Sequence, residues 1–228
     1  MAVTLAFDVY GTLINTHGVV TALQTLVGTK ALDFSQTWRD KQLEYSFRRG
    51  LMQNYVNFAA CTRQALDYTC AYYLANLAEK QKDSLLALYS VLPAFDDVKK
   101  ALQLLKETDF RLFAFSNGNT DALEKLLTAA GIRDSFLDII SVDDLKSFKP
   151  NPGVYSHFLR KSGATGNSAW LISSNPFDVT GAISAGMKSV WVQRSPEAIF
   201  DPWEIKPTII IKSLTTLSKK ITEWESGI

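Results

Sequence analysis

Five short apolar segments set the main constraint on the fold of this chain. Each is a nearly continuous run of aliphatic and aromatic residues, as in parallel strands that are covered on both faces. The predicted strands are Val3–Val9, Arg111–Ser116, Leu137–Val142, Ala169–Ser173 and Ser189–Val192. Stretches with helical periodicity separate the later strands and follow the last one: Asp97–Thr108, Thr120–Ala130, Pro152–Ser162, Phe177–Ala185 and Leu214–Glu225. This alternation predicts a doubly wound α/β fold with a parallel sheet.

Residues 15–93 interrupt the alternation. They show helical periodicity and no convincing strand pattern, and the predicted helices are Val19–Leu26, Phe34–Arg48, Tyr55–Leu74 and Lys80–Tyr89. We therefore predict an α/β core of residues 1–14 and 94–228, with a helical cap of residues 15–93 inserted after the first strand. Such an insertion would overhang the edge of the sheet at which open α/β folds bind ligands.

Composition and charge argue against several classes of partner. Of the 228 residues, 46% are hydrophobic and 21% are charged, as in ordinary globular proteins, and the net charge is only +1. No basic face or tail indicates a nucleic acid or an anionic membrane. The apolar runs near the ends are too short to span a membrane, and the first residues lead directly into a strand rather than a signal peptide. We expect a cytoplasmic protein.

The cysteines and histidines give no sign of a disulfide or a metal site. Cys61 and Cys70 would lie on opposite faces of one helix, beyond disulfide reach. We expect both to be buried thiols. His17 and His157 lack a neighbouring pattern of metal ligands, so we expect structural or surface roles for them.

Polar side chains follow four of the predicted strands, close to where each strand ends. Asp8 closes the first strand, and Ser116 and Asn117 begin the "SNGN" segment after the second. Lys149 lies soon after the third, and Asp178 ends the "SSNPFD" segment after the fourth. Because the carboxyl ends of parallel strands meet at one edge of a sheet, these side chains could converge on one site.

Each of these residues also has an ordinary structural explanation. Asp8 could begin a turn, and Ser116 and Asn117 could be turn and cap residues before the next helix. Lys149 could lie in solvent, and Asp178 could interact with the dipole of its own helix. For any single residue this explanation is at least as good as a functional one. Four independent structural roles at four successive strand ends are a less simple explanation than one functional site that contains all these residues.

Taken together, the segments resemble the haloacid dehalogenase superfamily, in which a nucleophilic aspartate, a Ser/Thr loop, a lysine and an acidic loop occur in this order. The resemblance extends over essentially the whole chain, including the helical insertion. It is more specific to the L-2-haloacid dehalogenases of type II. The segments similar to that group are "WRDKQLEYSFRRGLMQNYVNF" (residues 38–58), "SNGN" (116–119), "SVDD" (141–144), "FKPNPGVY" (148–155) and "SSNPFD" (173–178).

The differences from a phosphatase of this superfamily point to the leaving group. Phosphatases have a DxDxT motif, whose second aspartate protonates a basic alkoxide, and they bind Mg²⁺ with an additional acid in the last loop. Here Tyr10 replaces the second aspartate, and Ser173, Ser174 and Asn175 precede the single acid Asp178. A halide leaves without a proton, and a monoanionic 2-haloacid can be bound by hydroxyl, amide and ammonium groups. The pattern favours dehalogenation without a metal or other cofactor.

The resemblance implies a covalent mechanism. Asp8 would attack C2 of the substrate, expel halide with inversion and form an ester. Water activated near Asp178 would then attack the carbonyl of the ester and release a D-2-hydroxy acid. The resemblance further implies that Thr12 and Ser173 orient Asp8 and that Lys149 stabilises its carboxylate.

The resemblance also assigns the residues around the substrate. Ser116 would bind the substrate carboxylate, and Asn175 and Tyr155 would complete the network around the nucleophile. The predicted wall along the alkyl side consists of Tyr10, Leu43, Phe58 and Phe177. The family leads us to expect Ala-Trp or a similar pair where this chain has Pro176-Phe177. This difference leaves the preferred size of the substrate open.

Arg39 has two interpretations. On a helix it shares a face with Leu43 and Phe47. Helix statistics favour a packed stem with the guanidinium group in water. The resemblance instead implies that Arg39 and Asn117 donate hydrogen bonds to the departing halide. A preorganised cation in that position can contribute on the order of 3 kcal/mol to the stability of the transition state.

The sequence thus predicts a hydrolase that converts L-2-haloacids to D-2-hydroxy acids. Its partners would be a small 2-halocarboxylic acid, water and the halide product, and the resemblance implies a homodimer. A phosphatase or a related small-molecule hydrolase of the superfamily is the first alternative. The second is a non-catalytic binding protein on the same fold, although such a protein has no need of Asp8, Lys149 and Asp178 together.

Overall fold

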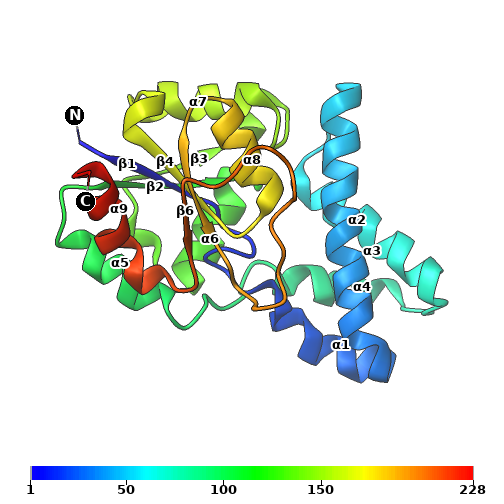
Figure 1. The fold of residues 1–228 in the computed structure, drawn as a ribbon. Coiled ribbons are helices and arrows are strands. Elements are labelled where there is room, and N and C mark those ends of the chain that lie inside the picture. Colours follow the sequence, from blue (N-terminus) through cyan, green and yellow to red (C-terminus); the bar gives the residue numbers. More distant parts are fainter. Residues whose placement is uncertain (1, 228) are drawn as a thin grey trace.

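The computed structural model describes residues 2–227 and has a six-stranded sheet in the order β3-β2-β1-β4-β5-β6, in which all neighbouring strands are parallel (Figure 1). The strands are β1 (Thr4–Phe7), β2 (Arg111–Ser116), β3 (Asp138–Ser141), β4 (Ala169–Ser173), β5 (Lys188–Val192) and β6 (Ile209–Ile211). The predicted doubly wound sheet is therefore confirmed. Strand β6 was not predicted from the sequence, because three residues are too few to give a periodic pattern.

Helices cover both faces of the sheet. They are α5 (Val98–Lys106), α6 (Thr120–Ala129), α7 (Pro152–Ser162), α8 (Pro176–Ser184) and α9 (Leu217–Glu225). Helices α5, α6 and α9 share one buried cluster with Leu5 and Phe7 of β1, whereas α7 and α8 contribute to a second cluster with Ala6 (Figure 1). Alternate residues of the central strand thus pack on opposite faces, as expected for a strand that is buried on both sides.

Four α-helices occupy the stretch between β1 and α5, as predicted for the insertion. They are α1 (Val20–Val27), α2 (Ala31–Met52), α3 (Phe58–Tyr73) and α4 (Glu79–Leu88). In Figure 1 they form a separate group beside the sheet, with the long α2 packed against α3. Helix α3 begins at Phe58 rather than at Tyr55, because the side chain of Asn57 accepts a hydrogen bond from the amide of Ala60 at 2.9 Å and caps the helix.

The chain leaves and re-enters the α/β core through two adjacent segments. The amide of Asn15 donates to the carbonyl of Pro93 at 2.9 Å, and the amide of Phe95 donates to the carbonyl of Leu13 at 3.0 Å. These bonds hold the two connections side by side, and the first connection reaches Asn15 seven residues after Asp8 along the chain. The first connection is therefore positioned by the same turn that presents Asp8.

The two cysteines, Cys61 and Cys70, are both buried free thiols on α3, as predicted.

Within residues 2–227, no helix combines the length and the apolar character that are needed to cross a bilayer.

Candidate active site

Asp8 lies immediately after β1, and its carboxylate is almost fully buried and surrounded by donors. Its Oδ2 atom accepts hydrogen bonds from Thr12 Oγ1 at 2.8 Å, from Asn175 Nδ2 at 2.7 Å and from Ser173 Oγ at 3.4 Å. Its Oδ1 atom accepts one from Lys149 Nζ at 3.2 Å. These contacts fix the carboxylate in one orientation, which is what a nucleophile that must attack in line requires.

A tight turn after β1 brings Thr12 back to Asp8. The amide of Thr12 donates to the carbonyl of Val9 at 3.3 Å, and Gly11 has a positive φ of 84°. A residue with a side chain rarely adopts this conformation, so the glycine permits the turn. Thr12 Oγ1 also accepts a hydrogen bond from the amide of Ser174 at 2.9 Å, which ties the turn to the loop after β4.

Lys149 connects the two buried carboxylates. Its ammonium group donates to Asp8 Oδ1 at 3.2 Å, to Asp178 Oδ2 at 2.8 Å and to the carbonyl of Phe115 at 2.9 Å. The side chain is completely buried. Burial by itself would lower the pKa of Lys149, but Asp178 and Asp8 outweigh this effect and hold that pKa above its ordinary value. The group is therefore a fixed positive charge at neutral pH.

Asp178 lies in the first turn of α8 and is fully buried. Its Oδ1 atom accepts a hydrogen bond from the hydroxyl of Tyr155 at 2.8 Å. Burial raises the pKa of Asp178 above its ordinary value, Asp8 raises it further, and Lys149 and Tyr155 act in the opposite direction. A buried carboxylate with a raised pKa is suited to accept a proton during a reaction.

A small cavity with a volume of about 10 Å³ opens in front of Asp8. Its ten lining residues were all among the predicted site residues: Asp8, Tyr10, Arg39, Leu43, Phe58, Ser116, Asn117, Lys149, Asn175 and Phe177. The remaining predicted residues, Thr12, Tyr155, Ser173 and Asp178, do not line it. Thr12 and Ser173 instead donate to Asp8, Tyr155 donates to Asp178, and Asp178 accepts from Lys149, all behind the cavity wall.

Arg39 reaches this cavity from α2. Its guanidinium group donates to Gln42 Oε1 at 2.6 Å and to the carbonyl of Tyr10 at 3.4 Å, and the residue is half-buried. Burial lowers the pKa of Arg39, although Tyr89 and Asp8 oppose this shift. The guanidinium group therefore does not extend into open solvent, contrary to what helix statistics alone favour.

The loop after β2 supplies the other polar wall. Ser116 Oγ accepts a hydrogen bond from the amide of Gly118 at 3.3 Å. Asn117 Oδ1 accepts one from the amide of Lys149 at 3.0 Å, which directs the amide nitrogen of Asn117 away from that backbone. Both side chains are buried and line the cavity beside Lys149.

Aromatic rings form the apolar wall. The ring of Phe177, at the start of α8, meets the ring of Phe47 from α2 edge-on, with their centroids 4.9 Å apart. The rings of Tyr10 and Phe58 are 6.0 Å apart. Helices α2 and α3 thus close over residues that the sheet presents.

Arg194 is a functional candidate that the sequence reasoning missed. Its Nη2 atom donates to the carbonyl of Thr12 at 2.6 Å and its Nε atom to the same carbonyl at 3.2 Å. Its Nη1 atom pairs with Asp97 at 2.8 Å. Arg194 follows β5 by two residues, so the strand-end argument that selected Asp8 could also have selected it. Gln42, which accepts from Arg39, is fully buried on α2, and the sequence gives no signal that distinguishes it from the other polar residues of that helix.

The donors around Asp8 do not fit the Mg²⁺ site of a superfamily phosphatase. Lys149 and Asn175 direct nitrogen atoms at the two carboxylate oxygens, where such a site would need a cation. Among residues 2–227, no group of three or more His, Cys, Asp and Glu side chains is arranged to hold a metal ion.

Sequence comparison places these features in a known group of enzymes. The family described as "haloacid dehalogenase-like hydrolase" matches residues 3–186. Haloacetate dehalogenase H-2 of Moraxella sp. (strain B) is 37% identical over 190 residues, which cover 83% of this chain and 85% of the relative. An (S)-2-haloacid dehalogenase of Pseudomonas putida is 34% identical over 214 residues, which cover 94% of each chain.

Structural comparison agrees. The structure of L-2-haloacid dehalogenase from Xanthobacter autotrophicus with covalently bound chloropropionic acid has a TM-score of 0.91 and 30% identity, covering 97% of this chain and 99% of that chain. The resemblance inferred from the sequence motifs is thereby confirmed. From its sheet, its strand-end residues and these relatives, the chain belongs to the haloacid dehalogenase-like hydrolases.

Proposed function

We propose that this protein hydrolyses L-2-haloacids to D-2-hydroxy acids. The observation that carries the proposal is the pairing of Asp8 with Lys149 in the wall of a small cavity that Arg39 also lines. A carboxylate nucleophile and a separate cation on one cavity suit a displacement in which negative charge moves from the attacking oxygen to the leaving group. The named activities of the relatives support the same conclusion.

In the first step, an Asp8 oxygen forms a bond to C2 while the carbon–halogen bond breaks. Attack from the side opposite the halogen inverts C2, and the halide carries away the electron pair. Arg39 and Asn117 donate hydrogen bonds to the departing halide, and Ser116 holds the substrate carboxylate. Because halide is a weak base, Tyr10 can stand where a phosphatase needs an acid.

In the second step, water adds to the carboxyl carbon of Asp8, and the bond between that carbon and the ester oxygen breaks. The oxygen that leaves on C2 came from Asp8, so C2 is not inverted again, and it takes up one proton of the attacking water to give the 2-hydroxy acid. Asp178 receives the other proton and returns it to solvent before the next turnover, which suits a buried carboxylate whose pKa is raised. Lys149 neutralises the negative charge that returns to Asp8.

We also propose a division of the chain and its assembly. Residues 1–14 and 94–228 would form the catalytic core, and residues 15–93 would form the cap that supplies Arg39. We infer a cytoplasmic protein without a nucleic-acid or membrane partner, because charges of both signs are mixed and the two cysteines are free. The homodimer is inferred only from the resemblance to the L-2-haloacid dehalogenases. Sedimentation of the purified protein tests the dimer.

One assay separates this proposal from its alternatives. The protein is incubated with L-2-chloropropionate in EDTA, and chloride and the configuration of the lactate are measured. The D enantiomer of the substrate is the matched control, and chloroacetate tests a substrate without an alkyl group. We expect chloride and D-lactate from the L enantiomer alone.

Hydrolysis of p-nitrophenyl phosphate that requires Mg²⁺, with no chloride, would instead identify a phosphatase. Neither activity, together with a tightly bound partner, would indicate a binding protein.

A further inference from the structure

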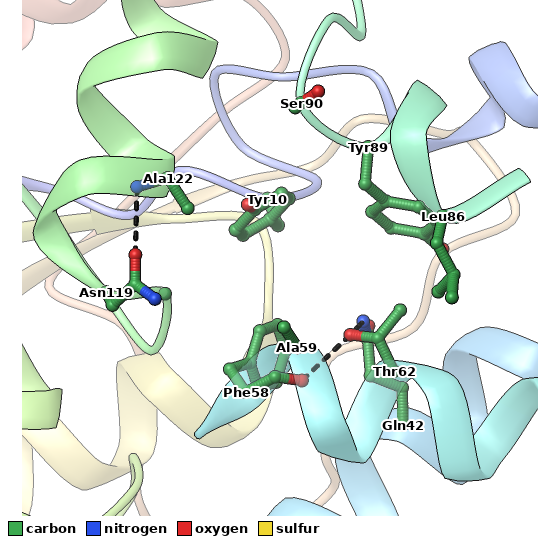
Figure 2. Close-up of a pocket in the computed structure, with 11 residues that line it drawn as sticks. Tyr10, Gln42, Phe58, Ala59, Thr62, Leu86, Tyr89, Ser90, Asn119 and Ala122 are labelled. Carbon is green, nitrogen blue, oxygen red and sulfur yellow. Dashed lines mark hydrogen bonds between the residues drawn. The ribbon is translucent and has the colours of Figure 1, made fainter. Parts of the chain in front are cut away.

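A second cavity lies behind the aromatic wall of the active site. It has a volume of about 240 Å³, and Figure 2 shows its residues around a common space, with Tyr10 and Phe58 facing Tyr89 and Leu86 across it. We call this cavity the apolar chamber. Its walls come from α2, α3, the end of α4 and the first turn of α6, which contributes Ala122.

Two rings separate the apolar chamber from the catalytic cavity. Tyr10 and Phe58 line both spaces, and their ring centroids are 6.0 Å apart at an interplanar angle of 43°. The loop after β2 is also shared, since Asn117 lines the catalytic cavity and Gly118 lines the apolar chamber. A Cβ atom at Gly118 would lie 3.4 Å from the ring of Tyr10 and 3.2 Å from Leu123. The absence of a side chain at Gly118 therefore avoids close contacts with the ring of Tyr10.

The chemistry of the apolar chamber suits an uncharged chain. All eleven residues that line it are uncharged. Burial raises the pKa of Tyr10 and that of Tyr89 to about 12, so both hydroxyls are neutral in physiological conditions. The polar groups are largely engaged: Thr62 Oγ1 donates to the carbonyl of Phe58 at 2.9 Å, and Asn119 Oδ1 accepts from the amide of Ala122 at 2.8 Å (Figure 2).

We infer that the apolar chamber receives the alkyl chain of longer 2-haloacids, so that the substrate range extends beyond haloacetate and 2-halopropionate. This inference rests on the proposed function. Tyr10 and Phe58 belong to the wall that the proposed function assigns to the alkyl side of the substrate, and they alone line both spaces. Rotation of these rings joins the two spaces, and the chain continues into the apolar chamber. Each methylene that leaves water there raises affinity by about fourfold.

The test compares two substrates that differ by three methylenes, L-2-chloropropionate and L-2-chlorohexanoate. We expect wild type to hydrolyse the hexanoate with a kcat/KM at least equal to that for the propionate. Ala122→Leu fills the apolar chamber without touching the catalytic cavity. It should lower kcat/KM for the hexanoate by about tenfold and change that for the propionate by less than about twofold. Ser90→Leu, on another wall, should act in the same direction.

Ala87→Leu is the matched control, because Ala87 lies on the exposed side of α4 and does not line the apolar chamber. It should leave the ratio of the two kcat/KM values unchanged. Rapid turnover of the propionate with none of the hexanoate in wild type would overturn the inference and leave the proposed function intact. Equal losses on both substrates in Ala122→Leu and Ser90→Leu would also overturn it.

A binding measurement distinguishes failure of the inference from failure of the proposed function. Hexanoate and propionate, which lack the halogen, are titrated calorimetrically into wild type and Ala122→Leu. Tighter binding of hexanoate that is lost in Ala122→Leu supports the apolar chamber even if neither haloacid is hydrolysed. Equal affinities of the two acids in wild type contradict it, whatever the activity.

Discussion

The ammonium group of Lys149 lies 3.2 Å from the carboxylate of Asp8, and both groups are buried from solvent. The same ammonium group pairs with Asp178 at 2.8 Å, so one cation compensates two buried anions. A buried ion pair adds little net stability over an apolar substitute, but the loss of one partner leaves a charge without compensation. The integrity of the site therefore depends on Lys149.

Lys149→Met should lower the free energy of unfolding by about 3 kcal/mol and abolish turnover, because it leaves Asp8 and Asp178 facing each other without a cation. Urea denaturation at neutral pH measures the stability, and chloride release measures turnover. Lys219→Met is the control, since Lys219 forms an exposed pair with Glu223 and should change stability by less than about 1 kcal/mol. Equal stability of the two variants would contradict the account.

Arg39→Ala should lower kcat for dehalogenation by about a hundredfold or more while leaving the protein folded, because its guanidinium group lines the cavity. The buried Gln42 Oε1 loses its donor, so we expect a loss of about 1–3 kcal/mol in the free energy of unfolding. Arg48→Ala, at an exposed position of the same helix, is the control. Chloride release by Arg39→Ala at the wild-type rate would show that Arg39 has no role in halide departure.

The pH dependence of turnover should report on Asp178. Its pKa is raised by burial, and hydrolysis of the ester needs its ionised form, so kcat should fall as the pH decreases through this raised pKa. The hydroxyl of Tyr155 stabilises the ionised form through its 2.8 Å hydrogen bond. Tyr155→Phe should therefore shift the acid limb of the profile to higher pH. Tyr72→Phe, at an exposed position, should not. An acid limb that stays in place in Tyr155→Phe would argue against Asp178 as the base.

Arg194→Met tests whether the hydrogen bonds from Arg194 to the Thr12 carbonyl hold the turn after β1 in its active position. The substitution removes two hydrogen bonds to the Thr12 carbonyl and leaves Asp97 without its cation. We expect a loss of about 1–3 kcal/mol in the free energy of unfolding by urea, and a decrease in kcat with little change in KM for 2-chloropropionate. A stability loss with unchanged kcat would make Arg194 purely structural.

The convergence of Asp8, Ser116, Lys149 and Asp178 could be predicted from the sequence, because a parallel sheet brings strand ends to one edge whatever the loops between them do. The sequence could not predict whether each of these groups would line the cavity or lie behind its wall. Asp178 contacts Lys149 behind the cavity wall, and this depends on how the first turn of α8 is oriented.

The contacts between the cap helices and the core were harder to predict. The meeting of Phe47 with Phe177 depends on where the start of α8 lies relative to α2, and helical periodicity fixes only the face of α2 on which Phe47 lies. The apolar chamber behind Tyr10 had no sequence signal, since it is formed by residues from five separate segments. Arg194 could have been found, because it follows a strand end in the same way as Asp8.

The central claim is that Asp8 forms an ester with the substrate, and isotope transfer tests it most directly. An excess of enzyme over L-2-chloropropionate is allowed a single turnover in H₂¹⁸O, and both the lactate and the peptide that contains Asp8 are analysed by mass spectrometry. The account predicts unlabelled oxygen at C2 of the lactate and one ¹⁸O atom in the Asp8 carboxylate. Lactate that carries ¹⁸O at C2, with an unlabelled Asp8 peptide, would show direct attack by water and contradict the account.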